Sequence, residues 1–336
     1  MLRPPPRPVE LVVKDALRDA GIKAQGPLRH ASSTSNMVFL SGHNIVRISR
    51  TGNGRLIREA ELCGALPDLA WTPEIIAFGS VNGADYLIVR RKSGSTLARW
   101  WPDMRQSQRQ DAVEQLGNCM RAIHFADVPA GLAALDGPPQ MLGNAGNPIL
   151  PVLHGLQQLR RNRYVDGAAI DDLETKVLTL GPALDDYSET RMVHGDLTFE
   201  NVLWDGSRIT AILDFEWARG APRDLDLDVL CRFLQWPDLH VDPAVAGRIR
   251  RSDFANVLGW LSGAYPELFS HRLLRQRLTL YGLAFEIRAT LQNPPKQPLG
   301  DLDPLHPYAR LLDVGSTGGP GPRLLTSMFS PPRSPR

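Results

Sequence analysis

One short segment constrains the fold of this chain more than any other: residues 192–217, which read MVHGDLTFENVLWDGSRITAILDFEW. An apolar approach ends in a His-Gly-Asp run at residues 194–196, and Asn201 follows five residues after the aspartate. Two β-like runs come next, joined by an Asp-Gly turn at residues 205–206, which is typical of a hairpin. Asp214 stands at the end of the returning strand. The segment therefore predicts that Asn201 and Asp214 lie close together.

The polar side chains of this segment are the types that phosphoryl transfer from ATP requires. That reaction needs oxygen ligands for Mg²⁺ and a carboxylate that orients and deprotonates the attacking hydroxyl group. Asp196, Asn201 and Asp214 supply these groups. Each of the three could alternatively be an ordinary cap, turn or strand-end residue, but all three at this spacing favour the catalytic interpretation.

The same residues carry a resemblance to a known group of enzymes. His-Gly-Asp, four residues, Asn, and then Ile-x-Asp-Phe is the pattern of the aminoglycoside phosphotransferase and choline kinase superfamily, relatives of protein kinases, and here it occupies residues 194–215. The resemblance implies an α+β, protein-kinase-like fold of two lobes that uses ATP and Mg²⁺. It also implies that Asp196 is the catalytic base, that Asn201 and Asp214 bind Mg²⁺, and that His194 braces the catalytic loop.

The resemblance extends upstream to the segment expected to hold the phosphates of ATP. Relatives place a basic residue on the third strand, paired with a glutamate on the following helix. Arg47 and Glu59 occupy these places here, with arginine in place of lysine; a surface salt bridge without catalytic duty is the alternative. The loop over the phosphates would fall at residues 32–36, with Ser33 as the phosphate contact. This loop contains no glycine, and a plain polar turn is equally compatible with it.

Two further sets of residues are assigned by the same resemblance. Adenine would meet the backbone just after the fourth strand, so Arg90 and Lys92 are candidate ATP contacts, although their side chains would also suit a solvated linker. Relatives often carry an aspartate after Gly-Asp-Pro that contacts the catalytic loop. This chain lacks the middle aspartate, and among the acids of residues 216–228 we assign that role to Asp226. Capping of a helix that begins near Leu227 is the alternative for these acids.

Apolar periodicity predicts how the rest of the chain is arranged. A helix is expected from Val9 to Gly21, and the helix at residues 107–124 ends in His124, for which we expect a packing role. Four short strands are expected to form two hairpins on either side of a helix at residues 55–66. The strands are residues 37–40, 44–48, 75–78 and 86–89, and later helices are expected at residues 227–236, 245–265 and 273–291.

The order strand, strand, helix, strand, strand is followed by mainly helical sequence, which predicts two lobes. We expect a nucleotide-binding lobe at residues 9–93 and a larger catalytic and substrate-binding lobe at residues 94–314. The proline-rich start at residues 1–8 and the tail at residues 315–336 contain too few apolar side chains to offset the entropy of ordering. Both ends are therefore expected to be disordered.

Composition disfavours several classes of protein. The formal net charge is only +2, so nucleic acid is not expected as a partner. No stretch approaches the roughly 20 apolar residues of a membrane span, and the start lacks the apolar core of a signal peptide, so we expect no membrane partner and a cytoplasmic location. Cys63, Cys119 and Cys231 form no metal or redox motif and are expected to be buried thiols.

Together these features predict an ATP-dependent phosphotransferase that moves the γ-phosphoryl group to a hydroxyl of a small molecule, such as an aminoglycoside-like antibiotic or another hydroxylated metabolite. A choline or amino-alcohol kinase is an alternative within the superfamily, because Trp217 or Trp236 would suit a quaternary amine. A non-catalytic nucleotide-binding scaffold is an alternative of another class, since the phosphate loop lacks glycine. A protein kinase is disfavoured because no Ala-Pro-Glu segment follows Asp214.

Overall fold

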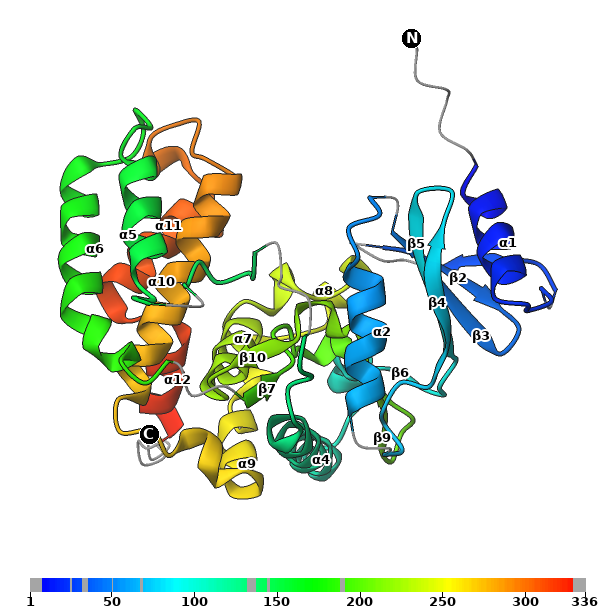
Figure 1. The fold of residues 1–336 in the computed structure, drawn as a ribbon. Coiled ribbons are helices and arrows are strands. Elements are labelled where there is room, and N and C mark those ends of the chain that lie inside the picture. Colours follow the sequence, from blue (N-terminus) through cyan, green and yellow to red (C-terminus); the bar gives the residue numbers. More distant parts are fainter. Residues whose placement is uncertain are drawn as a thin grey trace, which may run out of the picture.

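A computed structural model describes residues 8–24, 26–31, 36–49, 51–66, 69–131, 137–143, 146–187 and 191–328. The N-terminal part forms a small antiparallel sheet covered by two helices, and the remainder is mainly helical (Figure 1). The expected α+β class, with a small sheet followed by a larger helical region, is confirmed.

The N-terminal sheet has five strands in the order β1-β2-β3-β5-β4, and every neighbouring pair is antiparallel. Four of these strands are expected from the sequence, and β1 is additional. Asn82 and Gly83 join β4 to β5 with positive φ angles of 53° and 78°, a backbone shape that asparagine and glycine adopt readily. The strands are β1 (Arg29–Ala31), β2 (Met37–Ser41), β3 (Asn44–Ser49), β4 (Ile75–Val81) and β5 (Ala84–Arg90).

The two faces of this sheet pack against different helices. Successive side chains of a strand point to opposite faces, so neighbouring residues contact different helices. Val46 of β3 lies in one buried apolar cluster with α1 (Val9–Asp19). The next residue, Arg47, points to the other face, where α2 (Arg55–Ala65) packs on Leu87 of β5. The strand alternation thus carries Arg47 to the helix that bears Glu59.

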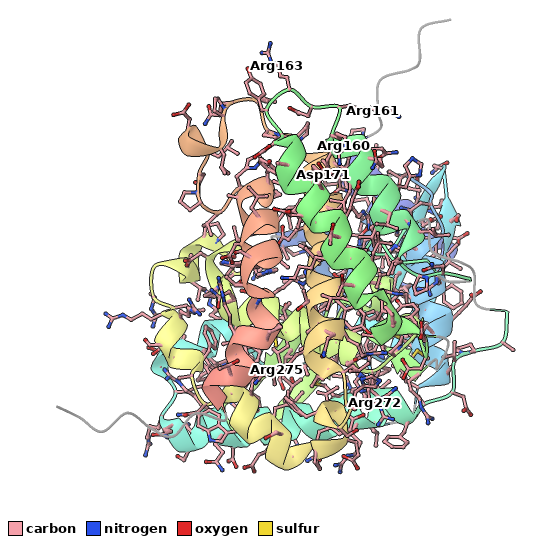
Figure 2. The ribbon with its side chains drawn as sticks, turned by 90° about the vertical axis from the view of Figure 1, so that its left-hand side faces the viewer. Arg160, Arg161, Arg163, Asp171, Arg272 and Arg275 are labelled. Atoms are coloured by element: carbon pink, nitrogen blue, oxygen red, sulfur yellow. The ribbon has the colours of Figure 1, made fainter. Side chains whose placement is uncertain are left out.

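The larger part of the chain surrounds two small sheets. One pairs β7 with β10, and the other has the order β6-β8-β9. Helices α5, α6, α10 and α11 gather at the end opposite the five-stranded sheet (Figure 1), and Figure 2 shows this end facing the viewer. The elements are β6 (Ser95–Thr96), α3 (Leu97–Trp100), α4 (Gln106–Phe125), α5 (Leu150–Leu159), α6 (Gly167–Leu180), β7 (Arg191–Val193), β8 (Val202–Trp204), β9 (Ile209–Ile212), β10 (Arg219–Ala221), α7 (Asp224–Gln235), α10 (Leu274–Gln292), α11 (Pro307–Thr317) and α12 (Pro320–Met328).

The single helix expected at residues 245–265 is wrong. The structure has two short helices instead, α8 (Pro243–Ala246) and α9 (Val257–Ala264), with a 3₁₀ turn between them. The Asp253 carboxylate accepts a hydrogen bond from the Arg250 backbone N–H at 3.1 Å, and such local bonds compete with continuation of a helix. The apolar pattern in this region therefore reflects burial more than helical continuity.

The expected disorder of the tail is also wrong for residues 315–328, which contain the end of α11 and the whole of α12. Leu325 is 2% exposed and belongs to the main apolar core. A Cβ at Gly321 would lie 2.7 Å from Leu278 Cδ1, so α12 packs directly on α10. Average composition conceals this contact, because a few well-placed residues supply it.

The remaining sequence-based expectations concern the ends of the chain, the cysteines and membrane-spanning helices. Residues 1–7 and 329–336, parts of the ends expected to be disordered, lie outside the described residues. Cys63, Cys119 and Cys231 are buried free thiols, as expected. Among the helices of the described ranges, none combines the length and the apolar character needed to cross a membrane.

We predict that Leu325→Ala lowers the free energy of unfolding by about 2–4 kcal/mol, because truncating a buried leucine loses apolar contact and leaves a cavity. Urea unfolding followed by circular dichroism measures the change. Thr326→Ala, at the exposed next residue of α12, is the matched control and should change stability by less than about 1 kcal/mol. Unchanged stability of the Leu325 variant would contradict the packing of α12.

Candidate active site

Asp196 and Asn201 meet in the loop that connects β7 to β8. The Asn201 amide nitrogen donates to the Asp196 backbone carbonyl at 2.7 Å and to its carboxylate Oδ2 at 3.3 Å. The Asn201 backbone carbonyl accepts from the Leu213 N–H at 2.8 Å, which holds the loop beside the end of β9. Asp214 follows directly, so the loop and the hairpin bring the three predicted residues into one region.

A buried carboxylate on α7 holds this loop from behind. Asp226, 0% exposed, accepts from the N–H groups of His194 at 2.9 Å and Gly195 at 2.7 Å, and from His124 Nε2 at 3.0 Å. Burial acts to raise the pKa of Asp226, but these hydrogen bonds hold it below its usual value. In the described chain no side chain caps α7, which begins at Asp224, so the helix-cap interpretation of Asp226 is wrong. His124 is also more than a packing residue.

The hydrogen bonds of His194 fix which of its ring nitrogens carries the proton. Nε2 lies 2.8 Å from the Leu213 carbonyl oxygen, which can only accept, so Nε2 is the donor and Nδ1 accepts from the Asp196 N–H at 3.3 Å. Burial lowers the pKa of His194, in keeping with a neutral ring. Between these residues, Gly195 has a φ of 80°, and a Cβ there would lie 2.4 Å from the Trp217 carbonyl oxygen. Only glycine fits at this position.

Arg47 joins the five-stranded sheet to the segment that follows β9. Its Nη1 lies 2.5 Å from Glu59 Oε1, and its Nη2 lies 2.8 Å from Asp214 Oδ1. Glu59 Oε1 also accepts from the Phe215 N–H at 3.2 Å. Burial opposes the charge of Arg47, yet Asp214 and Glu59 raise its pKa above the usual value. Arg47 and Glu59 therefore form a largely buried pair with a third partner, which a surface salt bridge would lack.

Asp214 adopts an unusual backbone conformation. Its φ and ψ are both 63°, in the left-handed region that residues other than glycine seldom occupy. Such conformations persist where surrounding contacts fix them, and they are concentrated at functional sites. The contact with Arg47 and the hydrogen bond from the next residue, Phe215, to Glu59 are the contacts that fix it here.

Several carboxyl groups of this region hold protons unusually well. Burial, followed by the negative charge of Asp214, raises the pKa of Asp196 to about 7, while the positive charge of Arg232 opposes the shift. Burial raises the pKa of Glu59 to about 7 against the effect of Arg47, and it raises the pKa of Glu216 as well. A carboxyl group with a pKa near 7 is suited to accept a proton at neutral pH.

Asn201 and Asp214 fit a Mg²⁺ ion. The Asn201 amide oxygen and Asp214 Oδ2 have no hydrogen-bond partner among the described residues. Mg²⁺ commonly takes only one or two protein oxygens, while phosphate oxygens and water complete its octahedron. In the part of the chain that the structure describes, no group of three or more His, Cys, Asp or Glu side chains forms a separate metal site.

The residues predicted to meet adenine are occupied by other contacts. Arg90 bonds through its side chain to Asn44 at 3.0 Å and Glu74 at 3.3 Å, and its backbone N–H donates to the Glu74 carbonyl at 2.9 Å. Lys92 Nζ donates to the Ala70 carbonyl at 3.3 Å. The structure therefore does not bring these two side chains together with Asp196. Ser33 lies outside the described residues.

Sequence reasoning did not assign Glu216 or Arg232 to the site. Glu216, 6% exposed, accepts a hydrogen bond from Asn36 at 3.3 Å. Arg232 forms an ion pair with Asp228 at 3.0 Å, and its charge acts on Asp196. A signal for Arg232 exists in the sequence, because it follows Asp228 by four residues and therefore lies on the same face of a helix.

Comparisons with known proteins identify the family and the fold of this chain. A model of the phosphotransferase enzyme family matches residues 28–292. A mutant of aminoglycoside phosphotransferase APH(4)-Ia in complex with ADP and hygromycin B has a TM-score of 0.60 at 16% identity, covering 95% of this chain and 99% of that chain. ADP-bound APH(2'')-Ib has a TM-score of 0.60 at 15% identity, covering 90% of this chain and 97% of that chain. At these identities the likeness shows the fold. Among curated proteins, none is significantly similar to the chain in sequence.

We predict that Asp196→Asn stabilises the protein at pH 8 and leaves it unchanged at pH 4. This carboxyl group titrates near pH 4 in an unfolded chain and at about 7 in the folded protein, so the folded state loses stability as pH rises through this window. The gain at pH 8 should be on the order of 2 kcal/mol, because partial exposure screens some of the cost. Urea unfolding without Mg²⁺ measures it, and equal effects at both pH values would contradict the raised pKa.

Proposed function

The chain belongs to the phosphotransferase enzyme family, and from this premise we propose that it transfers the γ-phosphoryl group of ATP to a hydroxyl group of a small molecule. The observation that carries the proposal is the juxtaposition of Asp196, whose pKa is about 7, with the Asn201 amide and with Asp214 held by Arg47. Hygromycin B and streptomycin are bound in solved structures of this fold. They support a hydroxylated acceptor, such as an aminoglycoside-like antibiotic or another hydroxylated metabolite.

In the proposed reaction Asp196 takes the proton of the acceptor hydroxyl while that oxygen bonds to the γ-phosphorus and the bond to the ADP oxygen breaks. The Asn201 amide orients the Asp196 carboxylate, and Asp226 holds the backbone of the loop. Mg²⁺, held by Asn201 and Asp214, would neutralise charge on the phosphate oxygens. Arg47 orients Asp214 and adds positive charge beside the phosphates.

The remaining contacts of ATP belong to the same proposal. Ser33 is the proposed phosphate contact in the loop at residues 32–36, and Glu59 holds Arg47. Adenine is proposed to meet the backbone near Arg90 and Lys92. Because the Arg90 N–H already donates to the Glu74 carbonyl, we assign the adenine contact to the backbone near Lys92.

The first test is turnover. We expect the protein, with ATP and Mg²⁺, to release ADP in the presence of one member of a panel of aminoglycosides, other hydroxylated antibiotics, choline, amino alcohols, and neutral and anionic hydroxylated metabolites. Asp196→Asn should lower the rate by roughly 10²–10⁴, the contribution of a positioned base, while retaining nucleotide binding. The wild-type rate should rise with pH through about 7, because the base must be ionised.

Asp171→Asn, an exposed aspartate of α6 (Figure 2), is the matched control for this test and should leave turnover unchanged. Equal turnover by the wild type and Asp196→Asn would contradict the mechanism. Binding of ATP with Mg²⁺, but no turnover of any acceptor, would favour a non-catalytic nucleotide-binding protein.

A second prediction concerns Arg47. Arg47→Lys should lower kcat/KM for ATP by roughly tenfold to a hundredfold, because an ammonium group cannot hold Glu59 and Asp214 with two fixed donors. Steady-state kinetics with varied ATP measure the loss. Arg160→Lys, at an arginine paired with Asp171 on the surface, is the matched control (Figure 2). A normal kcat/KM in the Arg47 variant would show that the bridge does not position Asp214.

A further inference from the structure

A pocket of about 210 Å³ lies beside the catalytic loop. Its lining includes Arg232, Trp236, His240, Phe285 and Arg310, which come from α7, the turn after it, α10 and α11. Residues 232–242 form one wall of the pocket and contact the catalytic loop, which connects β7 to β8. The Asp242 N–H donates to Glu200 Oε1 of this loop at 3.1 Å. The ring of Phe233 lies 5.0 Å from the ring of Phe199 in the loop. The pocket thus lies beside a segment that packs on the loop of Asp196, and the charge of Arg232, one of its lining residues, acts on Asp196.

The charged side chains of this pocket are paired in a way that leaves hydrogen-bond donors free but, among the residues that the structure describes, no free carboxylate. Arg310 holds Glu286, the one carboxylate of the lining, through both of its oxygens at 2.9 and 2.8 Å. Burial lowers the pKa of His240 to about 3, so its ring is neutral at pH 7. Arg232, 3% exposed, uses its Nε to bond Asp228 at 3.0 Å. Its two terminal nitrogens donate no hydrogen bond within the described chain.

The acidic residues of α7, the helix that carries Arg232, do not supply an unpaired negative charge to this pocket. Asp224 is 3% exposed and bonds to Arg277 and to the Tyr281 hydroxyl. Asp226 holds the catalytic loop, and Asp228 is 1% exposed against Arg232. A cationic ligand would have to take one of these buried carboxylates from its partner, which leaves a buried charge unpaired at high cost.

We propose that the acceptor is an uncharged or anionic hydroxylated molecule with a flat apolar part, and that Arg232 donates hydrogen bonds to one of its oxygens. Trp236 and Phe285 contribute aromatic rings to the lining, and the guanidinium groups of Arg310 and Arg232 lie over these rings at 5.4 and 3.7 Å. A carboxylate or carbonyl oxygen matches two parallel N–H donors. This inference rests on the proposed function, because it names the acceptor of that same site.

Three probes that share a phenyl ring and a hydroxyl group but differ in charge test the inference: phenyllactate (anionic), 3-phenylpropane-1,2-diol (neutral) and phenylalaninol (cationic). Gentamicin serves as the polycation. Isothermal titration calorimetry on the full chain, with Mg²⁺ and a non-hydrolysable ATP analogue, gives each affinity. We expect phenyllactate to bind roughly tenfold to a hundredfold tighter than phenylalaninol, the usual value of a charged hydrogen bond, and gentamicin to bind most weakly.

Two variants assign the preference to Arg232. Asp228→Asn with Arg232→Gln removes both charges of the buried pair, so that neither is left unpaired, and should reduce the preference to less than about threefold. Arg232→Lys keeps the positive charge and should retain part of the preference. Arg272→Gln, at an exposed residue before α10 (Figure 2), is the matched control and should behave as the wild type. Thermal unfolding of each variant checks that it is folded.

Tighter binding of phenylalaninol or gentamicin than of phenyllactate would overturn the inference, as would an unchanged order in the double variant or no binding of any probe. These outcomes are distinguishable from failure of the proposed function. Loss of Asp196-dependent turnover with every acceptor contradicts the reaction, whereas a reversed charge order in a protein that still turns over contradicts only the assignment of the acceptor.

Discussion

The Arg47 guanidinium is the contact on which the geometry of the site depends. It connects β3, α2 and the segment after β9, because it bonds Glu59 and Asp214 at the same time. Buried ion pairs of this kind add little net stability, since the cost of removing both charges from water offsets much of their attraction. Their effect here is geometric. The left-handed backbone of Asp214 is maintained by Arg47 on its side chain and by the bond from Phe215 to Glu59.

The proposed base, Asp196, has a raised pKa because the folded protein destabilises its ionised form. Asp196 sits among buried groups close to the charge of Asp214, and both effects raise its pKa toward neutrality. The same protein stabilises the loop at a neighbouring position, where Asp226 accepts hydrogen bonds from three donors and has a lowered pKa. Two aspartates on one loop and its supporting helix thus have opposite shifts. The hydrogen-bond donors around Asp226 lower its pKa, whereas burial and the charge of Asp214 raise the pKa of Asp196.

Much of the site can be predicted from the sequence, but contacts that depend on how distant parts of the chain pack cannot. The resemblance to the phosphotransferase family is sufficient to predict that Arg47 of β3 pairs with Glu59 on the next helix, as the structure shows. The contact of Arg47 with Asp214 is not predictable in this way, since it joins residues 167 positions apart and depends on how two parts of the chain pack. The ordered structure of residues 315–328 is not predictable from the sequence for a related reason. Their average composition is poor in apolar residues, yet Leu325 and the close approach at Gly321 suffice to dock a short helix.

The acids of residues 216–228 show why a motif predicts a reaction better than it predicts a substrate. In the sequence they form an acidic stretch whose partners cannot be identified, whereas in the structure Asp224, Asp226 and Asp228 are each buried against a partner. The proposed base and Mg²⁺ ligands come from residues close together in the sequence, so their spacing along the chain is enough to predict the reaction. The acceptor pocket draws on α7, α10 and α11, which meet only after folding. Which charged groups can reach a ligand in this pocket therefore depends on how these helices pack. In the packed structure of the described residues, Arg232 supplies free hydrogen-bond donors to the pocket.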